Sequence, residues 1–388
     1  MITHSFYESD NRVIRYAESL AQRGDSVEVF ALRRSPETSK EETINGVKLF
    51  RIQNRFSKDR QSKTADFLWP LLRFLVVSSW WLTRRHLRGR YQLVHVHNIP
   101  DFLVFAAWFP KLTGTKVILD IHDIVPEFFG SKFKVSDRSV LVWALKLVEK
   151  LSAAFASRVI LANHLWLGKY TTRSARREKC SVFLNHVDER IFHPRQLART
   201  GAKPVIMFPG GLQWHQGVDI AVQAFAKLRC RLPDAEFHIY GDGNMKPELV
   251  ALAQALGLNG SVRFFSPVRL GQIAEVMAGA DLGVVPKRAD SFGNEAYSTK
   301  IMEFMSLGVP MVVSSTKIDR YYFNDSVVKF FESGNPDALA DAMFDVLSND
   351  ELRRGMVARA SAYVSRNSWD NRKADYLGLV DSLCPQID

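Results

Sequence analysis

The chain of 388 residues lacks several features that would define other classes of protein. It has only three cysteines, Cys180, Cys230 and Cys384, and their odd number and wide spacing exclude a disulfide framework and a cysteine-based metal knuckle. This usage indicates a reducing compartment, so we expect a cytoplasmic protein. The first ten residues lack the basic and apolar regions of a secretion signal. No segment is of low complexity, and no repeat of about 20–50 residues indicates a solenoid.

A long hydrophobic run is also missing. The longest apolar stretch, residues 67–82, would reach about 24 Å as a helix, short of a bilayer core of about 30 Å, and it contains Pro70 and Arg73. We predict a helix that does not span a membrane. Its expected apolar stripe is Leu68, Leu72, Leu75, Ser79 and Leu82. Two interpretations stay open: a helix packed on the core with cations at its C-terminal end, or a surface that rests on anionic lipid through Trp69 and Trp80.

Acidic residues are scarce in the first half of the chain. Residues 1–200 hold 33 basic and 19 acidic residues, a net charge of +14, whereas the remainder holds 19 and 22, a net charge of −3. The first half should therefore face something anionic, and an anionic membrane surface is one candidate partner. A basic nucleic-acid-binding protein is the alternative, but aromatic stacking motifs on a sheet are absent and the second half is acidic. We expect no nucleic-acid partner.

Short β-branched runs alternate with helical patterns along the whole chain, which predicts an α/β fold with parallel sheets. The expected strands are 27–32, 93–97, 116–121, 158–162, 205–208, 236–240, 262–264, 282–285 and 311–313, after a stub at 1–4. The expected helices include 13–23, 140–156, 218–230, 247–256, 270–277 and 299–307. A polar, basic break at 189–204 separates two similar halves, so we predict two doubly wound domains with a ligand cleft at the carboxyl ends of their strands.

Glycines follow two strands of the second half. Gly241 and Gly243 lie between a strand and a helix, where the backbone can approach a phosphate or nucleotide, although such a turn is also common without a ligand. A dinucleotide fingerprint would need a third glycine where Lys246 stands, so an NAD site is not indicated. Gly210 and Gly211 open a comparable loop before a helix.

The stretch 284–313 carries two carboxylates and a lysine around the start of a helix. A carboxylate such as Glu303 can accept two hydrogen bonds from a ribose diol, each worth about 1.5–3 kcal/mol. Lys300 in the first turn could join the helix N-terminus in holding a diphosphate, and Glu295 could approach the same ligand from the preceding loop. The alternative is a solvated pair of Lys300 and Glu303 three residues apart.

The order of these motifs resembles that of the retaining family-4 glycosyltransferases of the GT-B fold over nearly the whole chain. Glu295-x7-Glu303 before Gly308-Val309-Pro310 carries the likeness, with the glycine loops and a last helix opening at Ser368-Trp369. The segments RVIRYAESLAQRGDSVEVFAL, YQLVHVHN, LNHVDERIFHP and IAEVMAGADLGVVP are similar to further landmarks. The resemblance implies two facing Rossmann-like domains and an interdomain cleft. Residues 1–195, completed by a C-terminal helix at 368–388, would bind the acceptor, and residues 203–367 would bind the nucleotide sugar.

The resemblance also implies roles for individual residues. It assigns catalysis to His122, which follows a strand at its carboxyl end, and to Glu295, which would contact the sugar hydroxyls of the donor. It places Glu303 on the ribose. The expected donor-binding residues are Gly210, Gly211, Gln216, Gly241, Arg288, Thr299, Lys300 and Glu303, and the expected acceptor-binding residues are Asn11 and Arg12.

The chain departs from the family at several positions. Gly211 and Gln216 stand where the family has an arginine and a lysine that clamp the diphosphate. We hypothesise that Lys300, with Lys287 or Arg288, replaces this clamp. The family's glycine-rich loop after the first strand is replaced by the residues 8–12, and His186 replaces the glycine of an Asn-Gly-Val-Asp landmark. These changes bear on acceptor contacts.

We therefore expect a retaining, hexosyl-type glycosyltransferase that moves a sugar from a nucleotide diphosphate sugar to a glycan or lipid-linked acceptor in bacterial surface polysaccharide biosynthesis. It would lie in the cytoplasm, peripherally on the inner face of the cytoplasmic membrane. No cofactor is expected. Because Asp120 and Asp123 do not form an Asp-x-Asp site, and His95 and His97 lack a third ligand at a telling spacing, no metal is expected either. The alternative enzyme is a nucleotide-sugar epimerase of the same architecture.

Overall fold

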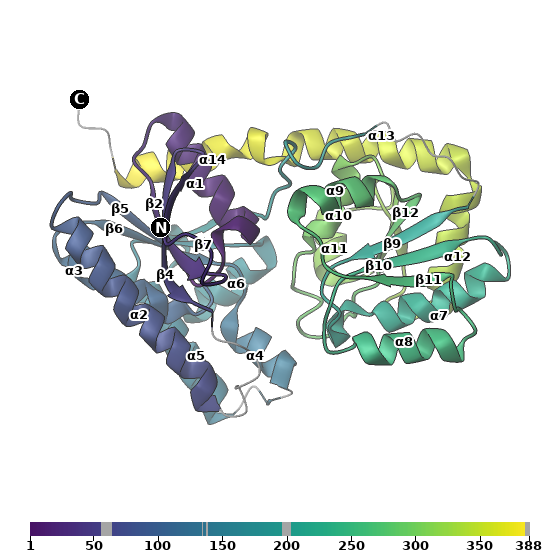
Figure 1. Cartoon of the computed structure of the whole chain (residues 1–388), viewed down its shortest axis with the longest axis horizontal. Helices are drawn as coiled ribbons and strands as arrows, with labels where there is room; N and C mark the ends of the chain where they lie inside the picture. The colour runs from purple at the N-terminus through teal and green to yellow at the C-terminus, as the bar shows by residue number, and fades with distance from the viewer. Residues whose placement is uncertain (56–63, 134, 137–138, 196–202, 385–388) are drawn as a thin grey trace. The chain divides into compact units, whose positions relative to one another are not determined.

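A computed structural model describes residues 1–55, 64–133, 135–136, 139–195 and 203–384 of the chain. The chain forms two compact units, Met1–Asn185 with Arg372–Asp388 and His186–Asn371 (Figure 1). The sequence analysis placed these boundaries at 195, 203 and 368. Part of the expected linker, 196–202, lies outside the described residues.

Among the described residues, the first unit has one sheet of eight strands in the order β3-β4-β2-β1-β5-β6-β7-β8. Its neighbouring strands run parallel except β3 and β4, which pair antiparallel. The strands are β1 (Ile2–Thr3), β2 (Glu28–Arg33), β3 (Glu41–Ile44), β4 (Val47–Asn54), β5 (Leu93–His97), β6 (Lys116–Ile121), β7 (Arg158–Leu161) and β8 (Cys180–Val182). The helices are α1 (Asn11–Arg23), α2 (Thr64–His86), α3 (Trp108–Leu112), α4 (Val125–Phe133), α5 (Val140–Phe155) and α6 (His164–Arg173), with the 3₁₀ helix η3 (Asp101–Ala107).

The second unit has a six-stranded parallel sheet in the order β11-β10-β9-β12-β13-β14 within the described ranges. The strands are β9 (Val205–Pro209), β10 (Glu236–Tyr240), β11 (Val262–Phe265), β12 (Leu282–Val285), β13 (Met311–Ser314) and β14 (Lys329–Phe331). The helices are α7 (Val218–Arg229), α8 (Lys246–Ala255), α9 (Leu270–Ala278), α10 (Thr299–Ser306), α11 (Lys317–Tyr322), α12 (Pro336–Ser348) and α13 (Asp350–Asn367), with the 3₁₀ helix η5 (Trp214–Gln216). The last helix, α14 (Trp369–Leu383), begins in this unit and continues into the first.

These two parallel α/β sheets confirm the predicted fold class. The predicted strands 93–97, 116–121, 236–240 and 282–285 have the observed bounds, and the other predicted strands differ by one or two residues at their ends. The same holds for most predicted helices, but the helix expected at 67–82 extends over Thr64–His86, and the last helix, expected at 368–388, is Trp369–Leu383. The prediction missed β3 and β4, which form an antiparallel pair at one edge of the first sheet, β8 at its other edge, and β14 at the edge of the second. Edge strands are short or partly polar, so their apolar pattern is weak.

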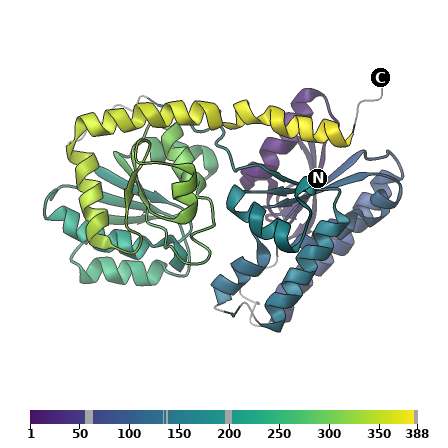
Figure 2. The same ribbon diagram turned by 180° about the vertical axis from the view of Figure 1, so that it is seen from behind.

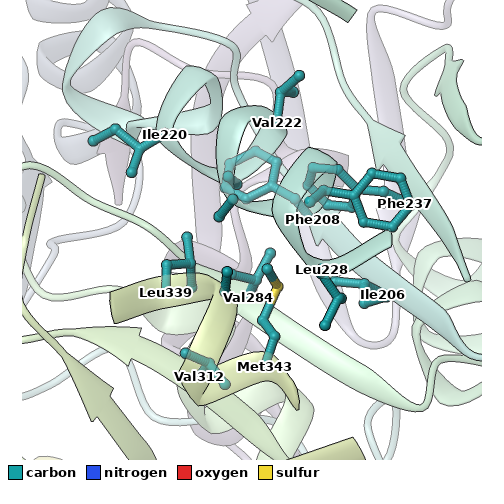
Figure 3. Packing of buried hydrophobic residues seen from close by; sticks show 14 of the residues in the cluster. Ile206, Phe208, Ile220, Val222, Leu228, Phe237, Val284, Val312, Leu339 and Met343 are labelled. Carbon is teal, nitrogen blue, oxygen red and sulfur yellow. The ribbon is translucent and has the colours of Figure 1, made fainter. Parts of the chain in front are cut away.

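The two faces of the second sheet pack against different helices because successive strand residues point to opposite sides. One face contributes to a buried cluster with α7 and α12 (Figure 3) that includes Ile206, Phe208, Phe237, Val284, Val312, Leu228, Leu339 and Met343. The alternating residues Met207, Val285 and Val313 belong to a second cluster with residues of α9, α10 and α13. Figures 1 and 2 show helices on both sides of this sheet.

Helix α2 differs from its predicted stripe. Its core-facing side chains are Leu71, Phe74, Ser78 and Leu82, whereas Leu68 and Leu72, which were expected on the same stripe as Leu82, are exposed. The stripe was wrong in phase because this helix is apolar almost all round, so periodicity alone does not select the packed face. None of the helices in the described ranges is long and apolar enough to cross a bilayer.

Candidate functional site

The loops that follow β9 and β10 are joined through their main chains at the carboxyl edge of the second sheet. The amide of Gly210 donates to the carbonyl of Tyr240 at 2.8 Å, and the amide of Leu212 donates to the carbonyl of Asp242 at 2.9 Å. Ligands of parallel α/β sheets bind at this edge, so the paired loops form one rigid wall of the candidate donor site.

Two glycines make this pairing possible. A Cβ atom on Gly241 would lie 1.9 Å from the carbonyl oxygen of Gly210, and one on Gly243 would lie 2.3 Å from the carbonyl oxygen of Leu212. The sequence analysis assigned Gly241 and Gly243 to the approach of a phosphate or nucleotide. The close approach that requires them in this structure is between two protein loops.

Lys300 extends from the first turn of α10 to the end of β9. Its Nζ donates to Oε1 of Gln216 at 3.1 Å and lies 5.3 Å from the ring centre of Phe208. A Cβ atom on Gly210 would lie 2.4 Å from Cε of Lys300, so this glycine, with φ of +139°, leaves the space that the lysine fills. The structure thus brings together three predicted donor-binding residues, Gly210, Gln216 and Lys300.

Charged and polar side chains lie together at the start of α10. Burial lowers the pKa of Lys300 to about 8, an effect that Glu303 opposes and Lys287 strengthens, so Lys300 is still a cation at neutral pH. Glu303 follows Lys300 by three residues on the same helix and is half-buried, and Thr299 is the first residue of this helix. Oγ of Ser298, which precedes the helix, is buried and has no hydrogen-bond partner among the described residues. The start of α10 therefore combines a cation with the positive end of a helix dipole, and a carboxylate follows in the next turn.

The other two cations proposed for the diphosphate clamp form ion pairs with aspartates of other elements. Nζ of Lys287 is buried, 3.0 Å from Asp319, and donates to the carbonyl of Ala296 at 2.7 Å. The guanidinium of Arg288 forms two hydrogen bonds with Asp219, at 2.8 and 2.6 Å, and lies 4.6 Å from the ring centre of Trp214. Lys287 and Arg288 therefore shape the loop after β12, and among these three cations Lys300 is the one placed at the glycine loop.

Glu295 lies in the loop between β12 and α10 and is half-buried. Its amide donates to the carbonyl of Phe292 at 2.9 Å. The next residue back, Asn294, donates through Nδ2 to the carbonyl of Ala289 at 2.7 Å and accepts at Oδ1 from the amide of Lys317 at 3.0 Å. Asn294 thus fixes the loop that carries Glu295. The sequence analysis missed Asn294 because one asparagine in a polar loop carries no periodic signal.

Asp120 is the centre of a buried polar cluster in the first unit. Arg12 donates to both of its carboxylate oxygens at 2.7 Å. Oδ2 also lies 3.2 Å from Nδ1 of His97 and 3.3 Å from Nε2 of His122. The sequence analysis did not assign Asp120 a role, although an ionisable residue near the end of an apolar strand was the available signal.

The cluster sets the charge of Asp120 and of His97. Burial alone would raise the pKa of Asp120, but the Arg12 guanidinium and His122 outweigh it and hold this pKa well below its usual range. Burial lowers the pKa of His97 to about 3, so His97 is neutral at pH 7. Asp120 is therefore an anion that accepts from its neighbours, and in a neutral His122 imidazole it favours the tautomer with the proton on Nε2.

The backbone of His122 is also held in place. Its amide donates to Oδ1 of Asn98 at 2.7 Å, and Nδ2 of Asn98 donates to Asp101 at 2.7 Å and to the carbonyl of Asp123 at 2.8 Å. The His122 side chain is 19% exposed, whereas that of Asp120 is fully buried. His122 is therefore the member of this group that a ligand can reach. Asn98 lies within the YQLVHVHN landmark of the sequence, but its role was not predicted.

The predicted acceptor-binding residues lie at the start of α1. Arg12 is buried, and Nη1 donates to the carbonyl of Phe183 at 2.8 Å and to Oδ1 of Asn185 at 3.0 Å, in addition to its pairing with Asp120. These contacts hold Arg12 inside the unit. Asn11 opens the helix, and its Oδ1 is buried without a hydrogen-bond partner in the described part of the chain. Asn11 therefore keeps an acceptor that a ligand could use.

His95, His97 and Asp120 bring their potential ligand atoms within 4.8 Å of one another, as a metal site would require. Both oxygens of Asp120, however, accept from Arg12, and this guanidinium would repel a divalent cation placed beside the carboxylate. The arrangement fits an ion pair better than a metal ligand set. Metal independence stays a prediction.

Both halves of the chain match known families. Residues 10–186 match the "Glycosyl transferase 4-like domain", and residues 189–362 match the "Glycosyl transferases group 1". A D-inositol 3-phosphate glycosyltransferase of Corynebacterium urealyticum is 31% identical over 192 residues, 46% of this chain and 43% of that protein. A phosphatidyl-myo-inositol mannosyltransferase of Mycolicibacterium smegmatis is 30% identical over 169 residues, 43% of this chain and 42% of that protein.

This chain therefore spans less than half the length of these two relatives. A solved structure, Anabaena Alr3699/HepE in complex with UDP-glucose, is 17% identical with a TM-score of 0.74 over 98% of each chain. This likeness shows the fold.

Proposed function

The chain belongs to the family-4 glycosyltransferases of the GT-B fold, and on that premise we propose that it transfers a hexosyl unit from a nucleotide diphosphate sugar with retention of the anomeric configuration. The observation that carries this proposal is the position of Lys300 against Gln216 and Gly210, with Glu303 one helical turn further on. A cation beside a glycine loop suits a diphosphate, and a carboxylate nearby suits a ribose diol.

In this proposal Lys300 replaces the arginine and lysine that clamp the diphosphate in the family and that this chain lacks. Negative charge grows on the diphosphate as the glycosidic bond breaks, and a preorganised cation stabilises that charge more in the transition state than in the ground state. The N-terminus of α10 adds its dipole. Glu295 binds hydroxyl groups of the donor sugar, and the loop hydrogen bonds of Asn294 keep it in position.

We propose that His122 binds a hydroxyl group of the sugar. In the neutral imidazole with its Nε2 proton directed to Asp120, Nδ1 can accept from a sugar hydroxyl, which orients the sugar ring without taking part in covalent chemistry. Retention then follows from departure of the diphosphate and attack of the acceptor on the same sugar face, with the leaving diphosphate accepting the acceptor proton. The protein supplies positioning and electrostatic stabilisation.

The acceptor is a glycan or a lipid-linked molecule. The net charge of +14 over residues 1–200 favours an anionic acceptor, and Asn11 supplies one polar contact. The two relatives carry inositol phosphate and phosphatidyl-inositol in their names, and both describe phosphorylated acceptors. We place the reaction at the cytoplasmic face of the membrane, in the assembly of bacterial surface polysaccharide.

A donor screen tests the proposal first. UDP-, GDP- and ADP-sugars are added separately, and the thermal midpoint of unfolding is measured, because a ligand that binds the native state at 100 times its Kd stabilises it by about 2.7 kcal/mol. We expect one nucleotide class to raise the midpoint and Lys300→Ala to reduce the rise. A chain that no nucleotide sugar stabilises would refute the donor assignment.

Retention of the anomeric configuration is tested on the reaction product. The donor that binds is incubated with membrane lipid extract, and the anomeric configuration of the product is read by proton NMR. Inversion would overturn the retaining mechanism. Incubation of the donor alone distinguishes an epimerase, which would convert the donor without an acceptor. Loss of transfer in EDTA, with recovery in magnesium, would overturn metal independence.

A further inference from the structure

Helix α2 presents an apolar face to solvent. Trp69, Val76 and Trp80 are 64%, 67% and 53% exposed, and Leu72 and Leu87 are exposed on the same side. Trp69, Leu72, Val76 and Trp80 follow one another at intervals of three and four residues, and Leu87 follows Trp80 by seven. They therefore form one stripe, which lies opposite the buried one. An exposed apolar face of this length, within a helix that also packs on the core, marks an interaction surface.

The stripe borders a groove of about 820 Å³. Its walls come from the second half of α2 and from Phe105 and Trp108, and Nε1 of Trp108 donates to Oγ of Ser79 at 2.9 Å. Trp80, Leu87 and Trp108 line the groove with exposed rings and methyl groups. We call the stripe and this groove together the α2 surface.

Helix α5 repeats the pattern beside η3. Val140, Trp143, Leu147 and Leu151 are exposed at intervals of three and four residues. Both α2 and α5 pack on η3. The ring of Phe105, which lines the groove, lies 5.2 Å edge-on from that of Phe155 at the end of α5. The apolar exposure of the first unit therefore extends over two neighbouring helices.

The exposed charged side chains that the structure describes on α2 and α5 are basic. No aspartate or glutamate occurs from residue 67 to residue 100, whereas Arg84, Arg88 and Arg90 are exposed at the end of α2. Helix α5 exposes Lys150, and its acidic residue, Glu149, is buried. A second copy of the chain would bring the same cations with no acidic residue on this stripe to pair with them. A surface with negative charge and an apolar interior offers the complementary chemistry.

We propose that the α2 surface docks the protein on an anionic lipid bilayer, with its tryptophans at the level of the headgroups and its arginines on lipid phosphates. Tryptophan is enriched at membrane interfaces, and arginines beside an apolar stripe are typical of helices that lie in the interface plane. This inference deepens the proposed function, on which it rests for its biological sense: it places the enzyme where a lipid-linked acceptor would be held.

Flotation of the full chain with vesicles tests the proposal. The vesicles are phosphatidylcholine alone, or the same lipid with phosphatidylglycerol as about a third of the total. We expect binding to the anionic vesicles, weakened by salt, and little binding to the neutral ones. Equal partition to both kinds of vesicle, or none to either, would overturn the proposal.

Two double variants separate the contributions. Arg84→Ala/Arg88→Ala should weaken binding by about 30-fold, since each cation near an anionic surface is worth about fivefold. Trp69→Ser/Trp80→Ser should weaken binding by about tenfold or more, because the apolar contact is lost. The matched controls are Arg366→Ala and Leu256→Ser, exposed residues of the second unit that should leave binding unchanged. Unchanged binding in both double variants would refute the assignment to the α2 surface.

Donor stabilisation measured without lipid keeps the two proposals apart. Variants that lose vesicle binding should keep the donor-induced rise in thermal midpoint, which also shows that they are folded. Absence of vesicle binding with donor stabilisation intact would refute the docking surface alone, and the reverse result would refute the donor assignment alone. Sedimentation velocity tests whether a second copy of the chain occupies the surface instead. If the parent protein is a dimer that does not bind lipid, and the tryptophan variant is a monomer, the α2 surface is an interface between two copies.

Discussion

Removal of the Lys300 ammonium is the perturbation that the structure makes most informative. The substitution Lys300→Ala deletes one hydrogen bond, from Nζ to Gln216 at 3.1 Å, and vacates the space above Gly210. The lost hydrogen bond costs about 1 kcal/mol of stability, and removal of a cation that burial disfavours offsets part of it. We therefore expect the variant to fold with nearly unchanged stability.

The rate should change far more than the stability. Removal of one preorganised group that stabilises developing charge costs about 2.7–4 kcal/mol, or about 10²–10³ in kcat. We expect a loss of this size when nucleotide release is measured with the donor found by thermal shift. The matched control is Lys329→Ala, which removes a lysine of the same unit whose Nζ lies 3.0 Å from Asp345, away from the glycine loops. That control should turn over at the rate of the unaltered enzyme.

The pH dependence gives a second readout of the same group. Lys300 must carry its proton to stabilise the diphosphate, and its pKa is lowered to about 8. We therefore expect kcat/KM to fall as pH rises through about 8, and we expect bound diphosphate to raise this pKa, so the fall in kcat should come at higher pH. The Lys300→Ala variant should lack this limb. An unchanged rate in the variant, or the same alkaline limb in both proteins, would refute the reasoning.

Two further substitutions test the packing of the glycine loops in the second unit and of the Asp120 cluster in the first. Gly241→Ala places a Cβ atom 1.9 Å from the carbonyl oxygen of Gly210 and should cost about 1–3 kcal/mol or more in urea unfolding, whereas Gly271→Ala, with no atom within 4 Å, should be neutral or stabilising. Equal stability of these two variants would contradict the paired loops. Asp120→Asn leaves the buried Arg12 cation poorly compensated and should cost about 3–5 kcal/mol, and a variant with the unfolding free energy of the parent would show that the ion pair is not needed.

Local patterns were sufficient for the framework of the fold. The bounds of β12, Leu282–Val285, follow from a short apolar run between turn residues, and those of β10, Glu236–Tyr240, from a short run in which the buried Phe237 and Ile239 alternate with other residues. Such runs are buried in a parallel sheet whatever their neighbours are, so their signal is contained in the sequence around them. The phase of α2 was wrong because both of its faces are apolar, and the choice between Leu68 and Leu71 depends on what packs against the helix.

The partners of site residues were not predictable in the same way. From the sequence we hypothesised that Lys300, with Lys287 or Arg288, replaces the clamp, and all three follow β12 and carry the same charge. The structure distinguishes them through Asp319 and Asp219, which come from other elements and bind two of the three. Hydrogen bonds between distant segments leave no periodic trace.

By itself the sequence determined the two α/β halves, the uneven charge and the family, because periodicity, composition and motif order are properties of neighbouring residues. Only the tertiary structure decided that Lys300 lies on the glycine loop, that Asp120 orients His122, and that the tryptophans of α2 face solvent. These facts depend on contacts between residues far apart in the chain, and burial and pairing are created by those contacts.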